Sequence, residues 1–148
     1  MPKVLIIIGS KSDAEYAEKA AQQLKALGIE SAVEVSSAHR DPERTSELAK
    51  RAEGDGYQVV IAMAGMAAAL PGLVAAHTSL PVIGVPLPAA LSGLDSLLSI
   101  VQMPPGIPVA TVAIGFPGAT NAAVLAARIL ALSHSEIKAS LAAHRTGL

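Results

Sequence analysis

The chain of 148 residues is a succession of short apolar runs, turn residues and amphipathic segments. Its first run, Val4–Ile8, is apolar at every position, which predicts a strand buried on both faces of a parallel sheet. A segment with alanine and leucine at helical spacing follows it and stops at Gly28, so we expect a helix there. Further strands are predicted at 32–35, 58–63, 81–85 and 109–114, and helices at 14–27, 42–53, 89–101, 119–132 and 135–144, with a short alanine-rich helix opening at Gly65.

Strands that alternate with helices predict an α/β fold, a doubly wound parallel sheet in three layers. The chain contains no internal repeat, linker or low-complexity segment, so we expect residues 1–148 to form a single domain. In open parallel sheets, ligands bind in the crevice beyond the carboxyl ends of the strands. The segments that directly follow the predicted strands are therefore where functional residues are expected.

Composition narrows the classes of function. A net charge of -1 provides no basic field for nucleic acid or for an anionic membrane. The absence of cysteine excludes disulfides, thiolate nucleophiles and zinc–thiolate sites, and the four histidines lack the close spacing of metal ligands. Because the chain opens on a strand-like run rather than on a secretory signal, we expect a cytoplasmic protein.

The middle of the chain is unusually poor in charge, since Asp95 is the only Asp, Glu, Lys or Arg between Gly56 and Ala127. The apolar stretch 59–76 has about the length of a membrane span, but two glycines and a proline interrupt it and no Lys or Arg flanks it as an anchor. A monomer with so little surface charge would expose large apolar patches. We therefore expect copies of the same chain to cover this region in a homo-oligomer.

The segment Gly9–Asp13, after the first predicted strand, suits an anion. Its glycine turns the chain, its two serines supply hydroxyls, and the next helix offers free N–H groups at its N-terminus. These features suit a phosphate. Simple capping of the helix by Ser12 or Asp13 is the alternative, and the spacing matches neither a dinucleotide fingerprint nor a P-loop.

The segment Ser37–Pro42, after the second predicted strand, suits proton transfer. His39 carries the side chain best matched to proton transfer near neutral pH, and Arg40 beside it can hold a phosphate or carboxylate through its planar guanidinium. The alternative is a helix start at Asp41-Pro42 with an incidental histidine. The position at the carboxyl end of a strand favours the functional interpretation.

Six stretches of the chain, in order and at matching spacing, resemble the class I enzymes of the PurE family. They are GSKSD at 9–13, SAHR at 37–40, AAALPG at 67–72, LPVIGVP at 80–86, GLDSLLSIVQMP at 93–104 and GIPVATVAIG at 106–115. The resemblance runs from about Val4 to Leu132. It implies a flavodoxin-like subunit in an octamer that uses no metal or organic cofactor. The implied reaction converts N5-carboxyaminoimidazole ribonucleotide into 4-carboxyaminoimidazole ribonucleotide in purine synthesis.

The resemblance also implies roles for particular residues. His39 is the expected general acid and base, which protonates the departing nitrogen and later removes the proton from ring carbon 4. The expected substrate-binding residues are Ser10, Ser12 and Asp13 at the phosphate and ribose, Arg40 at the phosphate, Ser37 and Ala38 beside His39, and Ala64, Gly65, Ala67 and Ala68 at the carboxylate. Carbon dioxide must stay trapped between the two steps, so the loop 102–106 and a neighbouring subunit are expected to close the pocket.

Three positions depart from the family pattern. Ala69 stands where the family usually has a second histidine, Asp41 replaces the usual threonine and brings a negative charge beside His39, and Phe116-Pro117 replaces a polar or small pair. Two alternatives to the mutase therefore stay open. One is a carboxylase that fixes free carbon dioxide onto aminoimidazole ribonucleotide. The other is a nucleotide-binding variant that is impaired in catalysis because of Ala69.

Overall fold

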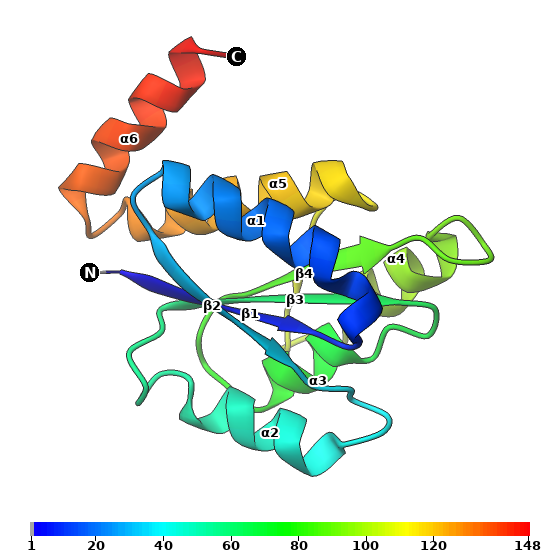
Figure 1. Ribbon diagram of the computed structural model, residues 1–148. Coiled ribbons are helices and arrows are strands. Elements are labelled where there is room, and N and C mark those ends of the chain that lie inside the picture. The colour runs from blue at the N-terminus through cyan, green and yellow to red at the C-terminus, as the bar shows by residue number, and fades with distance from the viewer. Residues whose placement is uncertain (1) are drawn as a thin grey trace.

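The computed structural model describes residues 2–148, in which a parallel sheet lies between two layers of helices (Figure 1). The strands are β1 (Lys3–Ile8), β2 (Glu30–Val35), β3 (Val59–Gly65), β4 (Val82–Leu87) and β5 (Ala110–Thr111). All of them pair in parallel, in the order β2-β1-β3-β4-β5, which is the order of the flavodoxin-like fold. The predicted fold class is confirmed.

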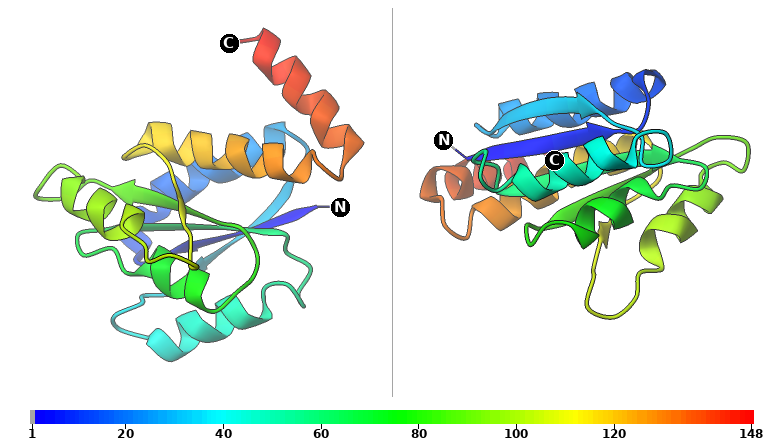
Figure 2. Two further views of the ribbon diagram at one scale, coloured as in Figure 1. Left: turned by 180° about the vertical axis from the view of Figure 1, so that it is seen from behind. Right: turned by 90° about the horizontal axis from the view of Figure 1, so that it is seen from below.

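The helices cover both faces of this sheet. They are the short 3₁₀ helix η1 (Lys11–Asp13) and the α-helices α1 (Ala14–Ala26), α2 (Pro42–Arg51), α3 (Leu70–Ala76), α4 (Leu94–Val101), α5 (Phe116–Leu130) and α6 (Ser135–Thr146). Helices α1 and α5 pack on one face, and α2, α3 and α4 on the other. Helix α6 contacts α5 and projects away from the sheet (Figure 2).

From Val4 onward, the sequence of β1 is apolar because both faces of this strand are buried. Val4, Ile6 and Ile8 belong to the core beneath α1 and α5, whereas Leu5 and Ile7 belong to the core on the opposite face. A strand in the interior of a two-faced sheet has no wet side, so each side chain is removed from water. The apolar stretch 59–76 divides into β3, a loop and α3. Among residues 2–148, no helix combines the length and apolarity needed to cross a membrane.

Most predicted element boundaries differ from the structure by one to three residues, and three predicted elements are shortened. The strand expected at 109–114 pairs only at Ala110–Thr111. The helix expected to open at Gly65 begins at Leu70, because Met66 adopts a left-handed φ of 53° that a right-handed helix cannot contain. Similarly, the helix expected from residue 89 begins at Leu94, directly after Gly93 with a φ of 89°.

Candidate functional site

One cavity of about 430 Å³ lies where the chain leaves the carboxyl ends of β1, β2, β3 and β4. This volume falls within the range of ordinary small-molecule sites. All eleven residues expected to act on or bind a ligand line it: Ser10, Ser12, Asp13, Ser37, Ala38, His39, Arg40, Ala64, Gly65, Ala67 and Ala68. The topology explains this, because parallel neighbouring strands end at the same edge of the sheet.

In the loop after β1, the side chain of Ser10 caps the 3₁₀ helix η1. Its Oγ accepts a hydrogen bond from the backbone N–H of Ser12 at 3.3 Å and lies 2.9 Å from the Ser12 hydroxyl. Asp13 occupies the N-cap position of α1, but its carboxylate makes no capping hydrogen bond. Asp13 thus holds the predicted N-cap position of α1 without capping it through its side chain, and Ser10 caps the preceding 3₁₀ helix η1. The Asp13 carboxylate is left to face the cavity.

Burial raises the pKa of the Asp13 carboxyl above its ordinary value of 3.8, and a hydrogen bond with the backbone of Ser10 acts in the opposite direction. The folded protein thus holds this proton more tightly than the unfolded chain does. Ionised Asp13 therefore costs stability above the raised pKa, and it contributes no difference once the pH falls below 3.8, where both states are protonated. A carboxylate kept at such a cost suits a ligand-binding role.

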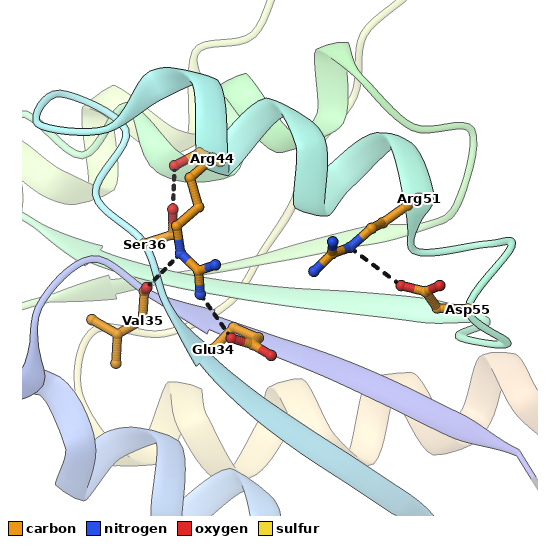
Figure 3. A network of polar contacts seen from close by, with 7 residues as sticks. Glu34, Val35, Ser36, Arg44, Arg51 and Asp55 are labelled. Atoms are coloured by element: carbon orange, nitrogen blue, oxygen red, sulfur yellow. Dashed lines mark hydrogen bonds and ion pairs between the residues drawn. The ribbon is translucent and has the colours of Figure 1, made fainter.

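We expect Asp13→Asn to raise the melting temperature at neutral pH, because the variant has no charge to desolvate. The gain should shrink as the pH is lowered and vanish below the ordinary pKa of an aspartate. Thermal denaturation monitored by circular dichroism between pH 3 and pH 8 measures it. The matched control is Asp55→Asn, which removes an exposed carboxylate 3.4 Å from Arg51 (Figure 3) and should give no such gain. A gain that is independent of pH would contradict the assignment.

The loop after β2 is a closed turn. The N–H of Asp41 donates to the carbonyl of Ser37 at 2.9 Å, and the N–H of Arg40 donates to the Ser37 hydroxyl at 3.1 Å. The Asp41 carboxylate caps α2 by accepting from the N–H of Arg44 at 3.2 Å. His39 and Arg40 project from this turn and are both exposed. Asp41 therefore serves the helix, and within the described chain it forms no ion pair with His39.

The loop between β3 and α3 forms a third wall. Met66 lines the cavity and is 64% exposed as a residue, and its left-handed φ places backbone strain at the site. Ala69 also lines the cavity and is exposed, at the N-cap position of α3. The residue type of Met66 carries no signal for a left-handed backbone, so its conformation was not predictable from sequence. Leu87, Pro88 and Ala89, which follow or end β4, complete the lining.

The expected closing loop and one departure from the family pattern lie outside the cavity in the described chain. Within residues 2–148, the loop 102–106 does not line the cavity, and Met103 instead packs against Gly72 in α3. Phe116 stacks on Tyr16 with ring centroids 4.3 Å apart, which gives this departure from the family pattern a packing role. In the described chain, His, Asp and Glu residues do not gather in a group of three that would hold a metal ion.

The cavity thus brings together an imidazole, a guanidinium, a carboxylate, three hydroxyls and a small-residue backbone. The guanidinium and the hydroxyls suit a phosphate, and the imidazole suits proton transfer to or from a ligand held beside it. Alanine and glycine in the 64–69 loop let backbone N–H groups approach a ligand closely. The arrangement favours acid–base chemistry on a small phosphorylated molecule.

Comparison with known proteins agrees with this chemistry. The model of the family described as AIR carboxylase matches residues 3–148. The N5-carboxyaminoimidazole ribonucleotide mutase of Saccharolobus solfataricus is 60% identical over 138 residues, which cover 93% of this chain and 86% of that protein. The enzyme of the same name from Escherichia coli is 56% identical over 136 residues, covering 91% of this chain and 80% of that protein.

Solved structures show the same likeness. The crystal structure of Treponema denticola PurE superposes with a TM-score of 0.90 and 37% identity, and the match covers 99% of this chain and 91% of that chain. A 3-dehydroquinate dehydratase-like protein from Bifidobacterium longum gives a TM-score of 0.59 at 19% identity. That second likeness shows the fold alone.

Proposed function

The chain belongs to the AIR carboxylase family, and on that premise we propose that it is an N5-carboxyaminoimidazole ribonucleotide mutase, an isomerase of purine biosynthesis. The observation that carries this proposal is the single cavity that holds His39 and Arg40 together with the loop after β1 and the small-residue loop after β3. We further propose that residues 1–148 act as one catalytic domain. A cytoplasmic location stays a prediction.

The proposed reaction has two steps, which His39 links. In the first, the bond between the exocyclic nitrogen and the carboxyl carbon breaks, its electron pair returns to the nitrogen, and protonated His39 gives that nitrogen a proton. Carbon dioxide remains in the cavity. In the second, ring carbon 4 attacks the carbon dioxide, and neutral His39 removes the proton from carbon 4. The histidine ends protonated as it began, so one residue with an exchangeable proton suffices for both steps.

The remaining cavity residues have proposed binding roles. Arg40 and the hydroxyls of Ser10 and Ser12 would hold the phosphate, and the Asp13 carboxylate would accept hydrogen bonds from the ribose. Backbone N–H groups of the 64–68 loop would hold the carboxylate and the carbon dioxide released from it. Two sides of the cavity are thus polar and suit the ribose phosphate. The small-residue side suits the reacting carboxyl group.

We propose a homo-oligomer, and an octamer as the family resemblance implies. Helix α4 carries Leu94, Leu98 and Val101 at helical spacing. With Leu91 just before the helix they form an apolar face whose residues are 46–64% exposed. Between residues 91 and 101, Asp95 is the only charged residue, so few side chains favour exposure of this face to solvent. A mass near eight chains in sedimentation equilibrium supports the octamer, and a monomer at micromolar concentration contradicts any oligomer.

Labelled carbon distinguishes the proposed mutase from a carboxylase. The protein is incubated either with N5-carboxyaminoimidazole ribonucleotide in the presence of labelled bicarbonate, or with aminoimidazole ribonucleotide and the same bicarbonate. A mutase forms unlabelled product in the first reaction and little in the second. Efficient labelling of product from aminoimidazole ribonucleotide would contradict the mutase and support the carboxylase.

The same assay tests the position of Ala69. This side chain lines the cavity, so Ala69→His would place an imidazole in the same space. If the natural protein is a competent mutase, turnover by the wild type is already appreciable and the variant changes it modestly. Tight binding of the ribonucleotide without turnover in the wild type, with turnover appearing in Ala69→His, would instead identify the impaired variant.

A further inference from the structure

Two buried hydroxyls face each other behind the turn that carries His39 and Arg40. Ser36 is the first residue after β2, and Thr45 lies in the first turns of α2. They are 3% and 0% exposed, and the distance between Ser36 Oγ and Thr45 Oγ1 is 2.7 Å. Burying a hydroxyl is unfavourable unless it is hydrogen-bonded, so a pair of this kind at the base of a site requires an explanation.

The direction of the proton in this pair follows from the neighbouring carbonyls. Thr45 Oγ1 lies 3.2 Å from the carbonyl oxygen of Ser37 and 3.0 Å from that of Asp41. Carbonyl oxygens only accept, so the single hydroxyl proton of Thr45 points to these two oxygens. The hydroxyl of Ser36 must then be the donor to Thr45. One side chain of α2 thus binds the end of β2 and both ends of the turn 37–41.

The turn has no other buried side-chain attachment of this kind in the described chain. Its internal hydrogen bonds set its shape but do not tie it to the sheet. Arg44 connects α2 to β2 by donating to Glu34 at 2.8 Å and to the carbonyl of Val35 at 3.4 Å (Figure 3). The side chains of that ion pair are 42% and 39% exposed, and exposed ion pairs contribute little to stability. The hydroxyl pair is therefore the attachment least affected by solvent.

We propose that Ser36 and Thr45 are positioning residues, which hold the turn so that His39 and Arg40 face the cavity. Ser36 and Thr45 themselves do not touch the ligand. This inference rests on the proposed function of His39 and Arg40. Within residues 2–148, neither hydroxyl lines the cavity of the site. Displacing a catalytic group by about 1 Å can cost a hundredfold in rate, so a small rotation of this turn would be measurable.

Three substitutions separate positioning from packing. Thr45→Val keeps the shape of the side chain and removes the hydroxyl, whereas Thr45→Ser keeps the hydroxyl and removes a buried methyl group. Positioning predicts that Thr45→Val lowers kcat/KM by about 10- to 100-fold. Thr45→Ser should retain kcat/KM within about threefold, although it loses thermal stability with its buried methyl group. Thr78→Val is the matched control, since its hydroxyl accepts only from the N–H of Leu80 at the amino end of β4.

A double-mutant cycle tests whether the two hydroxyls act as a pair. In Thr45→Val both carbonyls keep a backbone hydrogen bond: Ser37 accepts from the N–H of Asp41 at 2.9 Å, and Asp41 accepts from the N–H of residue 45 at 3.2 Å. Only the Ser36 hydroxyl is therefore left without a hydrogen-bond partner. Adding Ser36→Ala removes this unpaired hydroxyl. The double variant should consequently be no less stable than Thr45→Val alone, while its turnover stays low. If Thr45→Val does not fold, Ser36→Ala alone still tests the proposal through a smaller loss of kcat/KM.

Two measurements distinguish this proposal from the proposed function. If the wild-type protein shows no turnover, the mutase proposal fails. The positioning proposal can still be tested, because the affinity of the protein for aminoimidazole ribonucleotide, measured by calorimetry, depends on the position of Arg40. A tenfold or greater loss of affinity in Thr45→Val, but not in Thr45→Ser, supports positioning. The proposal is overturned if Thr45→Val keeps both rate and affinity within twofold of wild type, or if Thr45→Ser loses as much as Thr45→Val.

Discussion

Replacing His39 by asparagine is expected to lower turnover by about two to four orders of magnitude, the contribution typical of a positioned general acid–base residue. Asparagine keeps a polar side chain of similar reach but neither accepts nor delivers a proton near neutral pH. His39 is exposed at the tip of a turn whose shape is set by the backbone and by Ser37, so the fold should be unaffected. Steady-state kinetics with the carboxylated ribonucleotide measure the loss.

Binding separates this effect from a damaged site. Calorimetry with aminoimidazole ribonucleotide should show affinity within a few fold of wild type, since the phosphate is held by the loop after β1 and by Arg40 in the proposed complex. His77→Asn is the matched control, because His77 lies at the C-terminal end of α3, outside the cavity, and its turnover should not change. A His39→Asn variant that converts substrate at the wild-type rate would show that another group transfers the proton.

Gly118→Ala is expected to destabilise the protein by about 3 kcal/mol, at the upper end of overpacking effects. Gly118 is buried in the first turn of α5, and a Cβ there would press on the carbonyl oxygen of Ala113 and lie 2.7 Å from its carbonyl carbon. Both atoms belong to backbone, so no side chain can rotate away, and α5 or the segment before it must shift. For a chain of this size the change corresponds to a fall in melting temperature of about 10 °C.

Gly54→Ala is the control for this prediction. Gly54 is exposed, and a methyl group there meets only the carbonyl oxygen of Arg51, at the ordinary contact distance of 3.5 Å. Its melting temperature should stay within about 2 °C of wild type, as for most surface substitutions. Equal melting temperatures for Gly118→Ala and Gly54→Ala would mean that the α5 terminus moves freely relative to Ala113.

The membership of the cavity was largely predictable from sequence. The sequence identifies Ser10, Asp13, His39 and Arg40 because each lies in a segment that directly follows a run assigned to a strand. Parallel strands then bring such residues to one edge, whatever the details of packing. The capping roles were predicted less well. Ser10, Ser12 and Asp13 are all good capping residues, and their order in the chain does not show which of them caps a helix with its side chain.

The apolar pattern by itself determined the class of the fold, because a strand such as Val4–Ile8 that lacks a polar face must be covered on both sides. Only the tertiary structure decided the left-handed backbone at Met66, the late start of α3 and the hydroxyl pair of Ser36 and Thr45. Periodicity reports which side of an element is buried. It carries no information about which atoms of two different elements meet, and that contact determines how the turn bearing His39 is held.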